Sequence, residues 1–211
     1  DLALLGRTFY LIGDDGRLAG LSFEKTAIAE TDPPTAAPLR IAALPPDRIV
    51  TADADGRIRV WDFLEKEILS FASGWEAVTA LAVDQGGRIV ASGGPGGLRR
   101  WDLARRRLEI IGGPQAAVRF LRPYPRGGIL AVEAGGGPAT PDTLRLFDFE
   151  ACEARATPLP AGRPATGVNV YFDGRIVISC GARDPAKDGD PGTLFVVSPT
   201  PEGCSYLSIF G

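Results

Sequence analysis

Short apolar runs separated by turns rich in glycine and aspartate recur along this chain, and the stretch from Ile49 to Asp62, IVTADADGRIRVWD, shows the pattern most clearly. An apolar, β-branched pair is followed by the turn residues Asp53 to Gly56, which include two aspartates and a glycine, and by a second apolar run that ends in a Trp-Asp pair. An Asp-Gly pair between two β-prone runs favours a tight turn, because glycine tolerates a positive φ and aspartate accepts hydrogen bonds from its own backbone. The pattern therefore predicts a β-hairpin.

The hairpin pattern recurs along the chain. Ile89 to Asp102 reads IVASGGPGGLRRWD, shorter versions end at Asp148 (LRLFD) and Ser198 (LFVVS), and an earlier version ends at Ser22. The strand ends lie at positions 22, 62, 102, 148 and 198, so successive repeats are 40, 40, 46 and 50 residues apart. A period of this size, with strand, turn, strand and a Trp-Asp end, is the sequence signature of a propeller blade.

On these residues the chain resembles the WD-repeat (WD40) β-propeller family over nearly its whole length. The resemblance implies an all-β fold with about five four-stranded antiparallel blades in one domain, 1–211, with approximate blades 1–30, 39–71, 77–111, 116–158 and 166–210. Family members most often have seven blades, so either five blades close on themselves or the chain is part of a seven-bladed propeller. We expect a fragment or excised domain of a larger protein, also because the chain begins with Asp1 and contains no Met.

Composition restricts the possible partners and chemistry. The chain has 211 residues, is 45% hydrophobic and carries 23 basic against 26 acidic residues, so we expect neither nucleic acid nor a membrane surface as a partner. The three cysteines have no CxxC spacing, and nothing resembles a signal peptide, so we expect reduced thiols and a cytoplasmic location. No histidine is present, which removes the commonest general base and the commonest metal ligand.

The family pattern includes a hydrogen-bonded network of the strand-end Trp, a strand Ser or Thr, a turn Asp and a loop His. By resemblance, the second repeat keeps Trp61, Thr51 and Asp55, while Gly74-Trp75 stands where a Gly-His pair is usual. The third repeat keeps the Trp but has Pro95 in place of the turn Asp. We therefore expect divergent blades that are held together more by packing than by this network.

An enzymatic propeller of the glycoside-hydrolase type needs two carboxylates that converge in the central channel. The predicted innermost strands contain no Asp or Glu: Leu39–Leu44, Val78–Val83, Ala117–Leu121 and Val168–Phe172. We therefore predict no catalytic residue, no metal and no cofactor. Two alternatives stay open, namely an enzyme whose carboxylates come from blades outside this chain, and a spacer that only positions fused domains.

Two loops that join the second and third strands are long, Ala134–Thr143 and Gly181–Gly192. Insertions on one face of a repeat protein commonly mark its binding side, although the simpler interpretation, a solvated loop that has grown longer, is favoured over it. The charged residues that would form a contact surface here are Arg183, Asp184, Lys187, Asp188 and Asp190. The three aspartates lack the spacing and the closing Glu of the familiar calcium loop, so we predict no metal site.

Two further residues are candidates for partner contact. Trp75 is of a type enriched at interface hot spots, but it can also pack where the family histidine would lie. Arg100 occupies a slot that holds Val60 in the preceding repeat, so it either pairs with a buried acid or faces outward at an interface. The sequence as a whole predicts a non-catalytic WD40-like scaffold that binds a protein or peptide partner.

Overall fold

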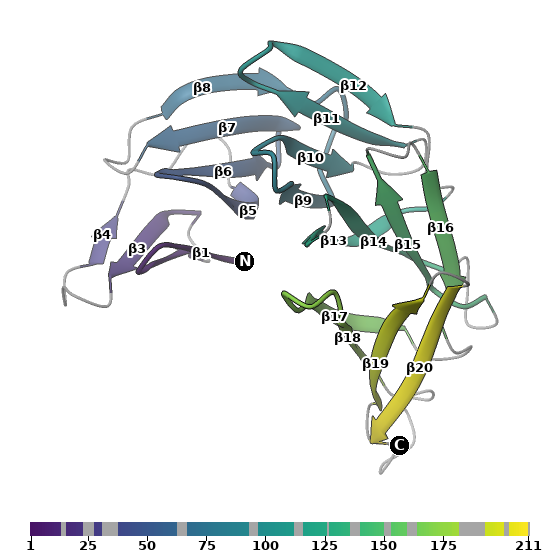
Figure 1. The fold of residues 1–211 in the computed structure, drawn as a ribbon. Coiled ribbons are helices and arrows are strands. Elements are labelled where there is room, and N and C mark those ends of the chain that lie inside the picture. The colour runs from purple at the N-terminus through teal and green to yellow at the C-terminus, as the bar shows by residue number, and fades with distance from the viewer. Residues whose placement is uncertain are drawn as a thin grey trace. The chain divides into compact units, whose positions relative to one another are not determined.

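The computed structural model describes residues 1–13, 16–22, 28–30, 38–62, 67–92, 97–111, 116–125, 127–135, 140–149, 153–159, 164–181, 193–200 and 203–210. These residues form five four-stranded antiparallel sheets, which we call blades 1 to 5 in chain order (Figure 1). In every blade the strands lie side by side in the order of the sequence, so each neighbouring pair is a hairpin. No helix long and apolar enough to cross a membrane occurs in this part of the chain.

The strand bounds follow the repeats. Blade 1 contains β1 (Leu2–Leu5), β2 (Thr8–Ile12), β3 (Leu18–Ser22) and β4 (Ile28–Glu30). Blade 2 contains β5 (Pro38–Leu44), β6 (Arg48–Asp53), β7 (Arg57–Asp62) and β8 (Glu67–Ala72). Blade 3 contains β9 (Ala80–Val83), β10 (Ile89–Ser92), β11 (Leu98–Asp102) and β12 (Arg107–Ile111). Blade 4 contains β13 (Val118–Tyr124), β14 (Gly128–Glu133), β15 (Thr143–Asp148) and β16 (Glu153–Pro158). Blade 5 contains β17 (Ala165–Val170), β18 (Ile176–Cys180), β19 (Thr193–Thr200) and β20 (Gly203–Phe210).

The hairpin predicted at Ile49–Asp62 is confirmed. Ile49 pairs with Trp61 across β6 and β7, and the Gly56 amide donates to the Asp53 carbonyl at 3.1 Å. Gly56 has a φ of +72°, a conformation that costs glycine little and other residues much more. The Asp-Gly turn therefore sets the register that places every apolar residue of the hairpin on its proper face.

The chain divides into two compact units, each built from stacked blades. Unit 1 comprises Asp1–Val83 and Gly87–Gly112, and unit 2 comprises Asp84–Gly86 and Gly113–Gly211. In unit 1, blades 1 and 2 enclose a core that contains Tyr10, Ile41 and Trp61, and blades 2 and 3 enclose a second core around Ile58 and Trp101. Burying an aliphatic or aromatic side chain of this kind stabilises the fold by about 1.5–3 kcal/mol, so face-to-face blade packing is the main source of stability.

Unit 2 repeats this arrangement with blades 4 and 5. Leu130, Val132 and Leu144 of blade 4 pack in one core with Ile176 and Ile178 of blade 5. The interface also has a polar contact, because the buried Tyr124 hydroxyl donates to the Gly174 carbonyl at 3.2 Å. Each unit thus holds its blades together by apolar faces with a few specific hydrogen bonds.

Matching positions in blades 1 and 2 differ in exposure. Leu2 and Leu21 of blade 1 have the same register positions as Ile41 and Trp61 of blade 2. Leu2 is 56% exposed and Leu21 42%, whereas Ile41 and Trp61 are 5% and 6% exposed. Blade 1 covers this face of blade 2, and no described strand of unit 1 covers the matching face of blade 1. Apolar side chains at these matching positions are therefore buried only in the blade whose face is covered by another blade.

The innermost strands of blades 3, 4 and 5 have bounds that differ from the predicted ones, and the strand of blade 5 shows why. The sequence predicts an innermost strand at Val168–Phe172, but β17 ends at Val170. Tyr171 and Phe172 belong to the following turn, where the Tyr171 amide donates to the Arg175 carbonyl at 2.8 Å and Gly174 has a φ of +87°. The β propensity of these aromatic residues favours a strand, whereas the turn that contains Asp173 and Gly174 begins at Tyr171 and leaves Phe172 90% exposed.

Candidate partner-binding face

The turn between β6 and β7 and the loop between β8 and β9 lie against each other at one end of blades 2 and 3. The Ser73 amide donates to the Gly56 carbonyl at 2.9 Å. A Cβ atom on Gly56 would collide with the backbone carbonyl of Trp75, so only glycine allows this approach. We call the surface formed by residues 54–57 and 73–79 the loop face.

Trp75 is held in one position on the loop face. Its ring is half-buried against the core between blades 2 and 3, and its amide donates to the Ser73 hydroxyl at 3.2 Å. The guanidinium carbon of Arg99 lies 4.3 Å from the centre of the ring, and the Arg99 Nη1 donates to the Ser73 carbonyl. A cation over an aromatic face is attracted by the quadrupole of the ring, so Arg99 fixes the indole from above.

A buried ionic cluster lies beside the turn of the loop face. Arg59 is 5% exposed and forms an ion pair with Asp53, whose side chain has no exposed surface. Arg59 also lies 3.1 Å from a carboxylate oxygen of Asp55 and 3.2 Å from one of Glu67, both of which reach solvent. One guanidinium therefore faces three carboxylates, and only the pair with Asp53 is fully removed from water.

Arg59 belongs to a position that repeats in the chain. Arg59, Arg99 and Arg145 each stand two residues before the aromatic end of the third strand in their blade. Arg145 pairs with Glu133, which is 4% exposed and matches Asp53 in register.

The third repeat lacks the carboxylate of the other two. Its sequence has Gly93 at the position of Asp53, so Arg99 has no such acid and reaches the loop face instead. The recurring arginine is visible when the repeats are aligned, but the contact of Arg99 with the loop face could not be predicted from the sequence.

The described ends of the long loop 134–143 are packed in unit 2. Asp142 is 4% exposed, and its carboxylate accepts hydrogen bonds from the amides of Gly135 at 2.7 Å and Ala165 at 2.8 Å. The side chain of Arg119 lies 3.7 Å from the same carboxylate. Asp142 therefore ties this loop to the first strand of blade 5, a structural role for which its position in the sequence gave no signal.

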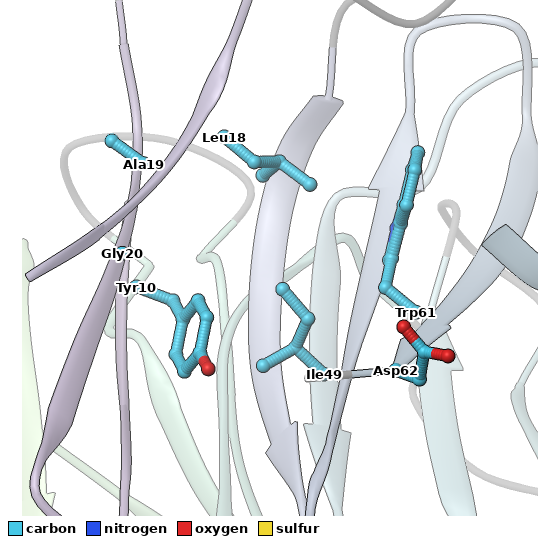
Figure 2. Close-up of a pocket in the computed structure, with 7 residues that line it drawn as sticks. All are labelled: Tyr10, Leu18, Ala19, Gly20, Ile49, Trp61 and Asp62. Carbon is cyan, nitrogen blue, oxygen red and sulfur yellow. The ribbon is translucent and has the colours of Figure 1, made fainter. Parts of the chain in front are cut away.

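A pocket opens between blades 1 and 2 (Figure 2). It is lined by Tyr10, Leu18, Ala19, Gly20, Ile49, Trp61 and Asp62. Gly20 stands in the slot that holds Val60 in blade 2, and a Cβ atom there would lie 3.3 Å from the Tyr10 ring. The titratable groups of the lining are one carboxylate, Asp62, and one phenol, Tyr10, so this pocket lacks the pair of carboxylates that glycoside hydrolysis needs.

The turn between β11 and β12 carries the most strongly shifted carboxylate of this region. The Asp102 side chain accepts hydrogen bonds from the Arg105 amide at 2.9 Å and from its guanidinium at 2.7 Å. These bonds, the backbone one above all, lower the pKa of Asp102 from 3.8 to about 2. Asp102 is therefore ionised at neutral pH and closes the turn as a fixed negative charge.

Comparison with known proteins identifies the fold. Residues 40–62 match the family described as WD domain, G-beta repeat. The WD40 β-propeller domain of Doa1 has a TM-score of 0.72 and 18% identity, over 95% of this chain and 64% of that one. A chain of the mitotic checkpoint complex has a TM-score of 0.73 and 15% identity, and the match covers 97% of this chain and 61% of that one. The structure of U3-55K has a TM-score of 0.69 and 16% identity, and the match covers 90% of this chain and 57% of that one. This chain carries a WD40 repeat and has the WD40 β-propeller fold. It spans 57% to 64% of the length of these structures, and no protein with a curated description matches it.

Part of the WD40 hydrogen-bond network is present in blade 2. The Trp61 indole nitrogen donates to the Thr51 hydroxyl at 3.0 Å in the interior, as the resemblance implied. Asp55 accepts instead from the Arg57 amide at 3.0 Å and from Arg59 at 3.1 Å. The turn aspartate thus stabilises its own turn, and the Trp-Thr pair persists without a histidine.

The structure places two of the candidate partner residues. Trp75 lies on the loop face, half-buried, so its packing and its surface position coexist. Arg100 is 9% exposed and donates from Nε to Glu109 at 2.8 Å. It therefore pairs with an acid, and this acid is partly exposed, with 28% of its side chain accessible.

The other candidates are Arg183, Asp184, Lys187, Asp188 and Asp190, all of which lie outside the described residues. Within the described ranges, no group of three or more Asp, Glu, Cys or His side chains is arranged to hold a metal ion.

Proposed function

We propose that this chain is a non-catalytic WD40 scaffold that binds a protein or peptide partner through the loop face of blades 2 and 3. We further propose that it works as a module of a larger protein in the cytoplasm. WD40 propellers generally mediate protein interactions, and fold alone does not give a function, so the proposal depends on the chemistry of this face.

The observation that carries the proposal is the fixed Trp75–Arg99 pair. Tryptophan and arginine are the residue types most enriched at interface hot spots, and hot spots work best when the side chains are already ordered before binding. The Ser73 hydroxyl holds the Trp75 backbone amide, the Arg99 guanidinium lies over the Trp75 ring, and Trp75 keeps part of its surface exposed. Binding a partner there costs little side-chain entropy.

The innermost strands support the non-catalytic part of the proposal. β1, β5, β9, β13 and β17 contain no Asp or Glu, and the chain has no histidine. General acid–base chemistry in a propeller channel needs such groups on the strands that line it. Arginine is the charged residue found there, as in Arg40 of β5, whose Nε donates to the Thr79 carbonyl of the loop entering blade 3 at 2.8 Å.

The proposal is tested by removing the aromatic anchor. Full-length protein with Trp75→Ala, with Arg99→Ala and without substitution is expressed with an affinity tag, and co-purifying proteins are quantified by mass spectrometry. Partners of the loop face should decrease at least tenfold with Trp75→Ala and less with Arg99→Ala. Ile68→Thr, at a site that is 44% exposed on β8 and away from the loop face, is the matched control. A set of partners that is unchanged by Trp75→Ala contradicts the proposal.

A further inference from the structure

The outer strand of blade 3 has two large apolar side chains in water. Leu108 is 49% exposed and Ile110 is 70% exposed. They lie opposite Trp101 and Arg99 of β11, so both belong to the face of blade 3 that packs on blade 2. β12 pairs with β11 on one side, and no strand of the described residues pairs with its other edge.

Blade 2 extends this apolar surface. Leu69 of β8 is 42% exposed and lies opposite Val60, and Phe71 lies opposite Ile58. The Phe71 ring centre is 5.5 Å from that of Trp101, so Phe71 packs on the same face of blade 3 that carries Leu108, which lies opposite Trp101. We call the surface formed by Leu69, Phe71, Leu108 and Ile110 the rim patch.

The packing of the blades does not require these residues. In blade 2, the positions matching Leu108 and Ile110 are Glu67 and Ser70, which lie opposite Trp61 and Arg59. In blade 4 the matching positions are Ala154 and Ala156. Blade 3 therefore carries large aliphatic side chains at exposed positions where blades 2 and 4 have polar or small ones, and contiguous exposed apolar residues often mark interaction sites.

Positively charged side chains at the start of β12 adjoin the rim patch. Arg105 and Arg107 have side chains that are 70% and 68% exposed, and Arg106 between them is also exposed. Their acidic neighbours are Asp102, 2.7 Å from Arg105, and Glu109, 3.5 Å from Arg107. Three guanidinium groups thus lie at the start of β12 beside two carboxylates, one of which, Glu109, is already paired with Arg100.

We propose that β12 and the rim patch bind an extended segment of a partner protein, which adds to blade 3 as a fifth, antiparallel strand. Main-chain hydrogen bonds to an open sheet edge provide affinity in this mode, and side chains on alternate positions provide specificity. All pairs in the blade are antiparallel, so the C-terminal end of the segment would lie beside Arg105–Arg107. The segment therefore has aliphatic residues on alternate positions and carboxylates at its C-terminal end. This surface adjoins the loop face, since Ile110 lies opposite Arg99, but the two share no residue, and the inference does not depend on the function proposed for the loop face.

The test uses a defined probe. A fluorescent nine-residue peptide with three Thr-Val pairs followed by three glutamates is titrated with the 211-residue chain, and binding is measured by fluorescence anisotropy. The chain should bind this peptide at micromolar concentration. Ile110→Asp should weaken binding at least tenfold, because it removes an apolar contact and repels the acidic segment. Ile68→Asp makes the same change on a β8 residue outside the rim patch, and it should leave affinity within twofold.

Two further measurements exclude non-specific binding. A peptide with the glutamates at its N-terminal end should bind at least fivefold more weakly, since its carboxylates would lie far from the arginines. Far-ultraviolet circular dichroism confirms that each variant is folded. The proposal is overturned if the chain does not bind the first peptide, if both peptides bind equally, or if the substitutions at 110 and 68 have the same effect.

Discussion

Removing either member of the buried Asp53–Arg59 pair should destabilise the protein, but by unequal amounts. Arg59→Leu leaves the Asp53 carboxylate, which has no exposed surface, without its cation. Breaking a buried pair in this way costs about 3–5 kcal/mol of unfolding free energy. Asp53→Asn leaves Arg59 with Asp55 at 3.1 Å and Glu67 at 3.2 Å, so its charge stays compensated and the cost is about 1–3 kcal/mol. We therefore expect Arg59→Leu to be worse by about 2 kcal/mol.

Urea denaturation followed by tryptophan fluorescence measures these costs. The double variant should cost less than the sum of the two single variants by about 1–3 kcal/mol, because the neutral amide that replaces the Asp53 carboxylate no longer needs a cation. Arg48→Leu is the matched control in the same blade, since its pair with Asp47 is exposed and spans 3.9 Å, and it should change stability by less than about 0.5 kcal/mol. Equal costs for the two single variants, or strict additivity, would refute the reasoning.

Three further substitutions test the turns and the WD40 network. Thr51→Val leaves the Trp61 indole N–H buried without its acceptor and should cost about 1–3 kcal/mol in urea denaturation; no loss would show that this hydrogen bond is unimportant. Gly56→Ala should destabilise the chain by more than about 1 kcal/mol, because the φ of +72° and the backbone against it both reject a side chain; a neutral variant would contradict the loop packing. Asp102 has a pKa lowered to about 2, so its contribution is present above pH 4 and lost as pH falls toward 2. Asp102→Asn should therefore be less stable than the parent at pH 6, and the difference should shrink as the pH falls toward 2; a difference that stays the same from pH 6 to pH 2 would argue against this assignment.

The repeat itself could be read from the sequence because its signals are local. Alternating apolar residues and the Asp-Gly turn at Gly56 predict the hairpin of blade 2, and the recurring Trp-Asp end at Trp61 and Trp101 predicts the same hairpin in blade 3. The Trp61–Thr51 hydrogen bond followed from resemblance. These features depend on residues within about ten positions of one another, which a single sequence contains.

The candidate site was less predictable because it depends on contacts between repeats. Trp75 could be singled out by its type, but its arginine partner could not, since Arg99 lies 24 positions further along the chain. Arg100 was a candidate because it replaces an aliphatic residue, but its side chain pairs with Glu109, and the side chain that reaches the loop face is that of Arg99. The Asp142 tie to blade 5 also joins distant segments. The direction of a side chain at a blade interface depends on packing between distant segments, so it cannot be predicted from a local sequence pattern.

The most direct test of the proposed function compares the two ends of one strand. A photo-crosslinking amino acid is placed at Ala54, which is exposed on the loop face just after β6, or at Asp47, which is exposed just before β6. Both sites belong to blade 2, so folding and expression should be affected alike. On irradiation of the full-length protein in cells, position 54 should form a specific protein adduct that Trp75→Ala abolishes, and position 47 should not. An adduct from position 47 alone, or one from position 54 that persists without Trp75, would contradict the proposal that the loop face binds the partner.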